Sequence, residues 1–245
     1  MTYNILNTSC RYEERKSLIR ASIAQQRPDI VGLQEVNSRN ERDLRSEDMR
    51  FEFARGIRAS PKKEEEDFLI QGVAVMLGKQ VKMGQTDTLY YDNDYKLAQK
   101  IQVTIHGREL VFINTHLNFN LQFDYSLRTA QVTSLLAWLA PVSSPIVCVG
   151  DFNFSPTHPL YSLMRQHFQS AYFEVHGTEP VLTFPTGLWG PFVDDCKQET
   201  LDYVWYRGER IRPVAAALAG TQGSAEKRLY GSDHYAVVAD FELLP

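Results

Sequence analysis

An apolar segment that stops at an acid and an amide runs from Pro145 to Asn153 and reads PIVCVGDFN. Its first part, Pro145 to Val149, has the composition of a buried strand, because branched apolar residues fill a short run that ends at glycine. Asp151 and Asn153 then lie just past the end of that strand. Taken alone, Gly150-Asp151 is equally consistent with an ordinary turn.

The same pattern, polar groups at the end of an apolar strand, recurs along the chain. It is found in Tyr3-Asn4-Ile5-Leu6, Leu33-Gln34-Glu35-Val36, Asn114-Thr115-His116-Leu117 and Ser232-Asp233-His234, while Leu201-Asp202-Tyr203 sets an acid inside a strand. Each segment alone has a structural explanation, such as a strand-end amide, a surface acid or a core histidine with its hydrogen bonds satisfied. Because strand ends at one edge of a sandwich converge, their joint occurrence predicts a single pocket.

The spacing of apolar residues predicts the elements between these segments. Helices are expected over Tyr12–Gln26, Glu41–Arg55, Ser126–Leu139 and His158–Phe168. Strands are expected over Ile30–Leu33, Ile70–Leu77, Val81–Leu89, Ala98–Ile105, Glu109–Thr115, Leu201–Tyr206, Ile211–Ala217 and Tyr235–Phe241. The charged run Lys62 to Asp67 is typical of a solvated loop. Hairpins mixed with crossovers indicate an α/β sandwich with helices on its outer faces, and no linker divides residues 1–245, so we expect one domain.

The composition excludes several classes of protein. The chain has 245 residues, 43% of them hydrophobic, and a net charge of -4, as in an ordinary globular protein. It lacks a strongly basic surface for nucleic acid, so an anionic substrate must meet a local cation or a bound metal. No apolar run approaches bilayer length, no secretory signal opens the chain, and no obligate protein partner is indicated. Cys10, Cys148 and Cys196 lack paired spacing, which fits a reducing compartment, and we expect a cytoplasmic location.

The residue types at the strand ends suit the hydrolysis of a phosphate ester. Water attacks such an anion only when the charge is neutralised and the nucleophile is oriented. Glu35, with Asp233 and Asn4, offers the hard oxygen ligands that Mg²⁺ or Mn²⁺ prefers. Asp151 would align or deprotonate the attacking water, and Asn153 would donate an amide hydrogen bond to the phosphate.

Two histidines complete this set of reacting groups. His116 and His234 would donate hydrogen bonds to the non-bridging phosphate oxygens as charge builds up in the transition state. Asp202 would orient His234 by accepting a hydrogen bond from its other ring nitrogen. A serine or cysteine nucleophile is not required.

These six segments, in this order from Asn4 to His234, resemble those of the endonuclease/exonuclease/phosphatase superfamily with the DNase I-like fold. The most specific of them are Gly150-Asp151-Phe152-Asn153 and Ser232-Asp233-His234. The resemblance implies a four-layer α/β/β/α sandwich of two mixed sheets, a phosphate-ester hydrolase, and an essential metal at Glu35. Some apurinic-site endonucleases of this family have an acid where this chain has Leu6, which argues against a second metal position there.

Further stretches resemble the deadenylase and nocturnin-like branch, among them Thr2 to Leu6 and Glu179-Pro180 followed by Thr183. Arg128 and Gln131 also fit its pattern, either as a helix face that clamps the loop above it or as substrate contacts. We expect substrate contacts from Asn118, Arg128, Phe184 and Trp189. The two aromatic rings lie in an irregular loop and would stack on a nucleobase, although packing is an equally good use for such rings.

The leading hypothesis is therefore a magnesium-dependent phosphodiesterase that acts on single-stranded nucleic acid or a nucleotide. A phosphatase of phosphoinositides, sugar phosphates or other phosphomonoesters is the alternative, and it would need a cluster of Lys and Arg around the pocket. A binding scaffold without chemistry is the non-enzyme alternative. The presence of Glu35, Asp151, Asn153 and His234 argues against a scaffold.

Overall fold

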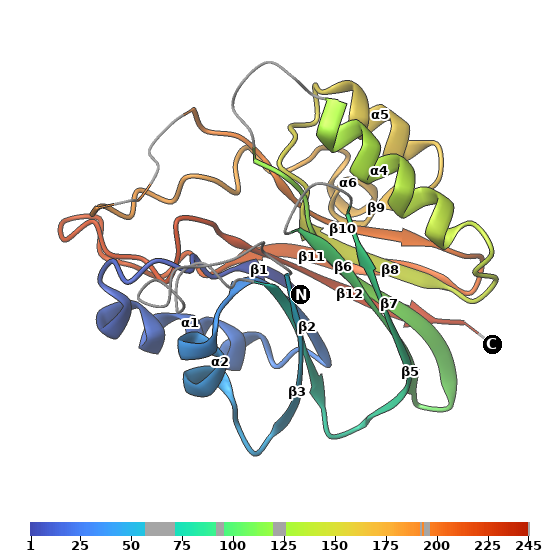
Figure 1. Cartoon of the computed structure of the whole chain (residues 1–245), viewed down its shortest axis with the longest axis horizontal. Coiled ribbons are helices and arrows are strands. Elements are labelled where there is room, and N and C mark those ends of the chain that lie inside the picture. Colours follow the sequence, from blue (N-terminus) through green and yellow to red (C-terminus); the bar gives the residue numbers. More distant parts are fainter. Residues whose placement is uncertain (57–71, 92–95, 120–125, 192, 194–196, 245) are drawn as a thin grey trace.

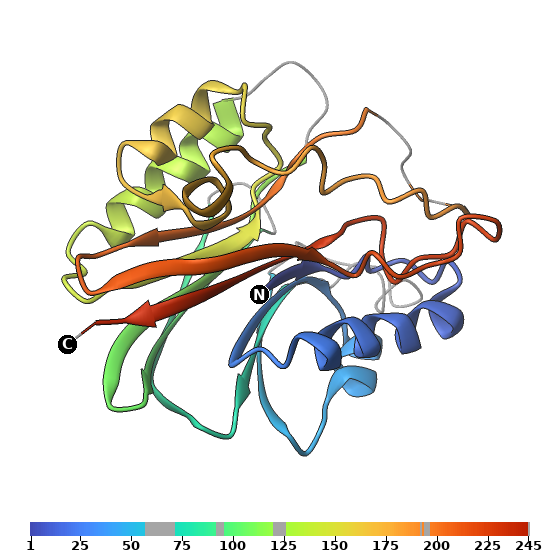
Figure 2. The same cartoon turned by 180° about the vertical axis from the view of Figure 1, so that it is seen from behind.

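Two stacked sheets, with helices on both outer faces, form the four layers of the molecule (Figure 1 and, from behind, Figure 2). The computed structural model describes residues 1–56, 72–91, 96–119, 126–191, 193 and 197–244. Within these residues the strands form two six-stranded sheets, in the orders β11-β12-β1-β2-β4-β3 and β5-β6-β7-β8-β10-β9. Each sheet mixes parallel and antiparallel pairs, so the predicted α/β/β/α sandwich of two mixed sheets is confirmed.

The first sheet contains strands from both ends of the chain. Its members are β1 (Thr2–Asn4), β2 (Ile30–Val36), β3 (Met49–Arg55), β4 (Gly72–Gly78), β11 (Ile211–Ala219) and β12 (Ala236–Leu243). The second sheet consists of β5 (Val81–Tyr90), β6 (Leu97–Ile105), β7 (Arg108–His116), β8 (Ile146–Asp151), β9 (Gln169–Ser170) and β10 (Asp202–Arg207).

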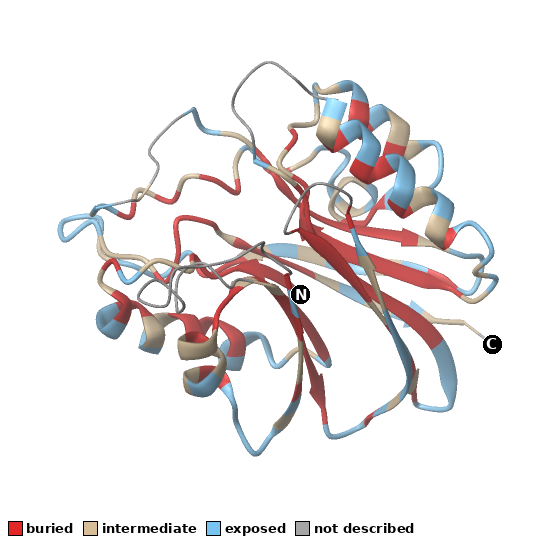
Figure 3. Ribbon diagram, viewed as in Figure 1, coloured by how far each residue is buried: buried red, intermediate tan, exposed pale blue. Residues whose placement is uncertain are grey.

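The helices bury their apolar faces on the outer side of each sheet. Helices α1 (Tyr12–Gln26) and α2 (Ser38–Leu44) cover the first sheet, where Ile19 and Ile23 of α1 join a core with Tyr3 and Leu33. Helices α4 (Ser126–Leu139) and α5 (Pro159–Arg165) cover the second sheet. The short helix α6 (Ala171–His176) lies beside β10 and β11. Figure 3 shows that burial is concentrated in the strands between these helix layers.

A buried polar network links the two sheets inside an otherwise apolar interior. The amide nitrogen of Asn114 on β7 donates to the carbonyl oxygens of Leu33 and Ala74 in the other sheet, at 2.9 Å each. Gln34 Nε2 donates in turn to Asn114 Oδ1 at 2.7 Å. These bonds are directional, so they fix how the sheets sit on each other directly below the ends of β2 and β7.

Two parallel strand pairs bring the predicted polar groups to one edge of the sandwich. Helix α1 connects β1 to the parallel strand β2, and α4 connects β7 to the parallel strand β8, so all four strands end on that edge. Strand β10 runs antiparallel to β8, and its first residue, Asp202, lies opposite Asp151. The turn before β12 reaches the same edge because β12 is antiparallel to β1.

Most predicted elements are confirmed, and one is wrong. Helices α1 and α4 have the predicted bounds. The helix predicted over Glu41–Arg55 does not exist, because α2 begins earlier, at the cap formed by Asn37, and ends at Leu44. Residues 49–55 instead form β3, whose apolar Met49, Phe51 and Phe53 alternate with polar residues as they pair with β4. The predicted helix from His158 is shorter than expected, and β9 and α6 follow it.

Other expectations are met in part or lie outside the described residues. Cys10 and Cys148 are free and buried, while Cys196 and the charged run Lys62–Asp67 are among the residues not described. In the described part of the chain, no helix has the length and apolar character needed to span a bilayer. A single domain over residues 1–245 stays a prediction.

Candidate active site

Asp151, at the end of β8, is the centre on which the predicted residues converge. Its Oδ2 accepts a hydrogen bond from Asn4 Nδ2 at 2.9 Å, and its Oδ1 accepts one from the backbone N–H of Asn153 at 3.0 Å. The Nε2 atoms of His116 and His234 lie 3.4 and 3.8 Å from Oδ2. Gly150 permits this arrangement, because a Cβ at that position would come within 2.1 Å of the Thr115 carbonyl oxygen on β7.

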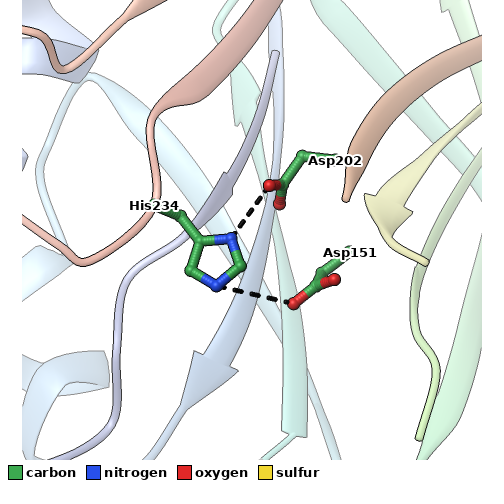
Figure 4. A group of neighbouring side chains, drawn as sticks. All are labelled: Asp151, Asp202 and His234. Carbon is green, nitrogen blue, oxygen red and sulfur yellow. Dashed lines mark hydrogen bonds and ion pairs between the residues drawn. The ribbon is translucent and has the colours of Figure 1, made fainter. Parts of the chain in front are cut away.

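His234 lies between two carboxylates (Figure 4). Its Nδ1 donates to Asp202 Oδ2 at 2.9 Å, and the Thr183 hydroxyl donates to the same oxygen at 2.6 Å. Burial alone would lower the pKa of His234, but Asp202 and Asp151 outweigh it and raise that pKa to about 10. The imidazole is therefore charged at neutral pH. Burial, and then Asp202, raise the pKa of the Asp151 carboxyl above its usual range.

His116 has the opposite electrostatic surroundings. The Nζ of Lys96 lies 3.0 Å from its Nδ1 and 2.9 Å from its Nε2, and both side chains are buried. Burial, the Lys96 ammonium and the charged His234 together hold the pKa of His116 well below its usual value. Sequence reasoning missed Lys96, because a single lysine at the start of a strand carries no pattern.

Asn4 links Glu35 to Asp151, because its Nδ2 donates to both carboxylates. Glu35 lies in a left-handed conformation (φ 59°), where the pairing of β2 with β4 is irregular, and this turns its side chain away from the strand. Its Oε1 accepts from Asn4 Nδ2 at 3.3 Å, and its Oε2 accepts from the backbone N–H of Asn7 at 3.0 Å. Burial raises the pKa of Asp233 to about 6; the charge of His234 opposes this shift, and Glu35 adds to it.

Two sets of residues contain the side-chain types that bind metal ions. Among the described residues, only Asp151, Asp202 and His234 form a group of three His, Cys, Asp or Glu side chains whose ligand atoms lie within 4.8 Å of one another. Within this group His234 Nδ1 is already hydrogen-bonded to Asp202 Oδ2 at 2.9 Å, so the group fits a proton-transfer network better. Glu35, Asp233 and Asn4 supply hard oxygens, and a bound cation would offset both the burial of Asp233 and its repulsion by Glu35, which together raise the pKa of Asp233.

The α4 residues Arg128 and Gln131 hold the loops that follow β8 and β7. Arg128 Nη1 donates to the Asn153 carbonyl oxygen, and Gln131 Oε1 accepts from the backbone N–H of Asn118 at 2.9 Å. Asn153 itself is in a left-handed conformation (φ 52°), and its Nδ2 donates to the Leu117 carbonyl oxygen at 2.9 Å. These contacts fit the clamping alternative, while substrate contacts from Asn118 and Arg128 stay predictions.

The two predicted stacking rings differ in exposure. Phe184 is only 8% exposed, and its ring centroid lies 4.7 Å from that of His234, so it packs against the catalytic candidate. Trp189 is 59% exposed, and the guanidinium of Arg228 lies 6.0 Å from its ring centroid. Trp189 is therefore the better placed of the two to stack on a ligand.

Arg15, on α1, is a second buried cation that sequence reasoning missed. Its guanidinium has five N–H groups, and they donate to five backbone carbonyl oxygens at 2.8 to 3.1 Å, those of Cys10, Ile5, Gly231, Leu6 and Thr8. The side chain thereby joins the turn after β1 to the turn that carries Asp233 and His234. An arginine within a charged helix gives no sign of this in the sequence.

Comparisons with known proteins agree with this architecture. Nocturnin of Drosophila melanogaster is 26% identical over 96% of this chain and 42% of its own length, and nocturnin of Xenopus laevis is 31% identical over 61% and 41%. The chain thus spans about two fifths of these relatives.

Among solved structures, the human nocturnin catalytic domain with bound sulfate matches with a TM-score of 0.77 at 23% identity, over 98% of this chain and 91% of that one. D. rerio TDP2 complexed with a single-strand DNA product matches with a TM-score of 0.79 at 18% identity, over 98% and 97% of the two chains. The family model described as the Endonuclease/Exonuclease/phosphatase family covers residues 1–234. The chain therefore belongs to the endonuclease/exonuclease/phosphatase family.

Proposed function

We propose that this chain is a divalent-metal-dependent phosphoesterase that hydrolyses phosphodiester bonds in single-stranded nucleic acid or in a nucleotide. The observation that carries the proposal is the group around Asp151. A carboxylate that accepts from Asn4 and Asn153 lies 3.4 and 3.8 Å from the Nε2 atoms of two histidines. Such a pocket offers both a proton acceptor and hydrogen-bond donors to an attacking water and a phosphate.

Each side chain has a separate task in this proposal. Glu35, Asp233 and Asn4 would hold Mg²⁺ or Mn²⁺, which when bound supplies positive charge to the phosphate oxygens. Asp151 would receive the proton of the attacking water, because it lies at the end of β8 within 4 Å of both histidines. His234, held by Asp202 at 2.9 Å, would donate from Nε2 to a phosphate oxygen. Asn153 and His116 would donate further hydrogen bonds without adding negative charge.

Single-stranded nucleic acid as substrate is supported by the exposed ring of Trp189 and by the relatives. An exposed indole with an arginine beside it suits stacking on a nucleobase without a broadly basic surface. The TDP2 structure similar to this chain was obtained with a single-strand DNA product. Nocturnin is similar along nearly the whole of this chain.

The proposal is tested by an activity screen with Mg²⁺ or Mn²⁺. The substrates would be poly(A), single-stranded DNA, an abasic duplex, dinucleotides, inositol phosphates and sphingomyelin. We expect cleavage of a single-stranded nucleic acid or a dinucleotide, and loss of that cleavage in Glu35→Gln with the fold retained in circular dichroism. Release of phosphate from inositol phosphates alone would favour the phosphatase alternative. An inactive protein that captures a partner would favour the scaffold.

A further inference from the structure

The buried side chain of Arg15 has no task in the mechanism proposed above. It extends from α1 to two segments that carry or hold site residues, the 5–11 loop (residues 5–11, between β1 and α1) and the 231–235 turn (residues 231–235, before β12). Four of its N–H groups donate to carbonyl oxygens of the 5–11 loop, and the fifth donates to the carbonyl oxygen of Gly231 at 2.9 Å. One side chain therefore connects both segments to α1.

The backbone of the 5–11 loop holds the side chains of two proposed metal ligands. The N–H of Leu6 donates to Asn4 Oδ1 at 3.1 Å. The N–H of Asn7 donates to Glu35 Oε2 at 3.0 Å. Leu6 is left-handed (φ 54°), a conformation that a leucine keeps only when its surroundings impose it. The guanidinium of Arg15 is part of those surroundings, because it donates to the Leu6 carbonyl oxygen at 3.1 Å.

The 231–235 turn carries the third proposed ligand, Asp233. Ser232 Oγ donates to Asp233 Oδ1 at 3.1 Å and accepts from the backbone N–H of His234 at 3.2 Å. The turn also packs closely on α1, because a Cβ at Gly231 would come within 3.2 Å of the backbone nitrogen of Ile19. The guanidinium bond to the Gly231 carbonyl oxygen adds a directional contact to this packing.

We propose that Arg15 is a positioning residue for the metal site, which holds the oxygens of Asn4, Glu35 and Asp233 in place before any cation binds. The inference rests on the proposed function, because it takes these three residues as the ligands. A planar guanidinium with five donors bridges both segments at fixed angles, which a lysine with three donors on a flexible stem cannot do. Ligands that are already ordered bind a metal more tightly, because less conformational freedom is lost on binding.

The first test needs no variant, because it compares the metal-free with the metal-loaded wild type. Amide hydrogen exchange of the full chain, followed by nuclear magnetic resonance, reports on the N–H groups of Leu6 and Asn7 separately. We expect both to be protected in EDTA, and Mg²⁺ to change their exchange rates by less than about threefold. Exchange as fast as in an open chain in EDTA, with protection only after Mg²⁺ is added, would overturn the proposal, since the metal would then order its own ligands.

The second test uses Arg15→Lys, which keeps the charge but not the fork of five donors. We expect Kd for Mn²⁺, measured from the electron paramagnetic resonance of the free ion, to rise roughly 10- to 100-fold, with faster exchange at Leu6 and Asn7. The Mg²⁺ concentration for half-maximal hydrolysis of an activated phosphodiester should rise by a similar factor. Arg20→Lys, which changes an exposed arginine on the same helix, is the matched control and should behave as the wild type.

A folded Arg15→Lys variant with a Kd for Mn²⁺ within about twofold of wild type would overturn the proposal even if its melting temperature fell, because a purely structural role costs stability alone. If Arg15→Lys does not fold, the exchange rates of the wild type decide. A wild type that binds neither Mg²⁺ nor Mn²⁺ would contradict the proposed function, and with it the metal site that Arg15 is proposed to order. A wild type that binds both ions but has an open 5–11 loop in EDTA would contradict the role of Arg15 alone.

Discussion

The side chains around Asp151 form one continuous series of polar contacts. Asp202, His234 and Asp151 follow one another at 2.9 and 3.8 Å, and His116 and Lys96 continue the series on the other side. Asp202, His234 and Asp151 are each buried beside a group of opposite charge, which offsets the cost of removing them from water. The removal of one member therefore affects its neighbours as well as its own contact.

Asp202→Asn tests whether Asp202 acts by orienting and charging His234 or only by filling space beside it. The asparagine keeps the shape of the side chain and its neighbour Thr183, but it removes the charge that raises the pKa of His234 and holds its ring. We expect kcat on bis(p-nitrophenyl) phosphate to fall by about 100-fold or more. Asp48→Asn, which changes an exposed acid paired with Lys79, is the control and should leave kcat unchanged. A rate within about threefold of wild type in Asp202→Asn would remove Asp202 from the mechanism.

Trp189→Ala tests whether the exposed indole binds the substrate beyond the reacting phosphate. Stacking on a base is worth about 1–3 kcal/mol, so KM for an oligonucleotide should rise by roughly 5- to 150-fold. KM for bis(p-nitrophenyl) phosphate should not change, because that substrate carries no base to stack. Trp138→Ala is the control, since that indole lies near the end of α4 against Lys100. An equal effect on both substrates would indicate damage to the pocket instead.

The site residues that directly follow an apolar strand could be predicted from the sequence. The site residues that lie outside such strand ends could not. Asp151, His116 and Glu35 are recognisable because an apolar run stops at each of them. Lys96 and Arg15 are not, because their importance comes from contacts with segments far away in the chain. A lone basic residue next to a strand or within a helix has the same local signal whether it faces water or a buried pocket.

Strands and helices place these side chains through a few polar contacts between elements. Asn114 of β7 bonds to Leu33 and Ala74 across the sheets, and Arg15 of α1 bonds to five carbonyl groups. Neither contact involves a residue proposed to react. Both lie beneath turns that carry such residues, so the geometry of the pocket depends on elements outside it.

Asn114→Ala should therefore destabilise the protein strongly. The change removes the side-chain donor of two buried carbonyl groups and one acceptor of the Gln34 amide, and each unsatisfied buried group costs about 1–3 kcal/mol. We expect the free energy of unfolding in urea to fall by about 3–5 kcal/mol. Gln102→Ala, which removes an exposed side chain on β6, should change it by less than about 0.5 kcal/mol. A loss below about 1 kcal/mol for Asn114→Ala would show that the network is dispensable.

The spacing of apolar residues predicts an element correctly where only the helical or only the strand spacing is present. It fails where both spacings occur in the same segment. Helices α1 and α4 bury residues at intervals of three and four positions and have the predicted bounds. In residues 41–55, charged residues suggest one long helix, yet Met49, Phe51 and Phe53 have the period of a strand. Pairing with β4 decides in favour of the strand. That partner comes later in the chain, so local spacing does not reveal it.

At the scale of the whole molecule, the candidate site takes residues from both sheets. Glu35 and Asn4 come from the first sheet, while Asp151 and His116 come from the second. The hydrogen bond from Asn4 to Asp151 crosses between the sheets at 2.9 Å. A ligand that binds residues of both sheets will therefore stabilise the docked form of the sandwich.

Mg²⁺ should accordingly raise the melting temperature. At a concentration of about 100 times Kd the ion adds about 2.7 kcal/mol, which corresponds to roughly 5–10 °C for a domain of this size. Differential scanning calorimetry with and without EDTA measures the shift. Glu35→Gln should abolish most of it, and Glu52→Gln, which alters an acid on β3 paired with Arg50, should not. An equal shift in Glu35→Gln would place the metal away from Glu35.

The left-handed backbone at Glu35 and Asn153 determines which substitutions a screen for thermostable variants would favour. Both residues adopt positive φ angles, 59° and 52°, which glycine adopts without strain and other residues adopt at a cost of about 1–3 kcal/mol. Glu35→Gly would relax the chain and remove the carboxylate in one step. Glycine at either position would therefore raise thermal stability and lower catalytic activity. A library of variants screened for thermostability alone would enrich inactive proteins with glycine at the very sites where the fold stores its strain.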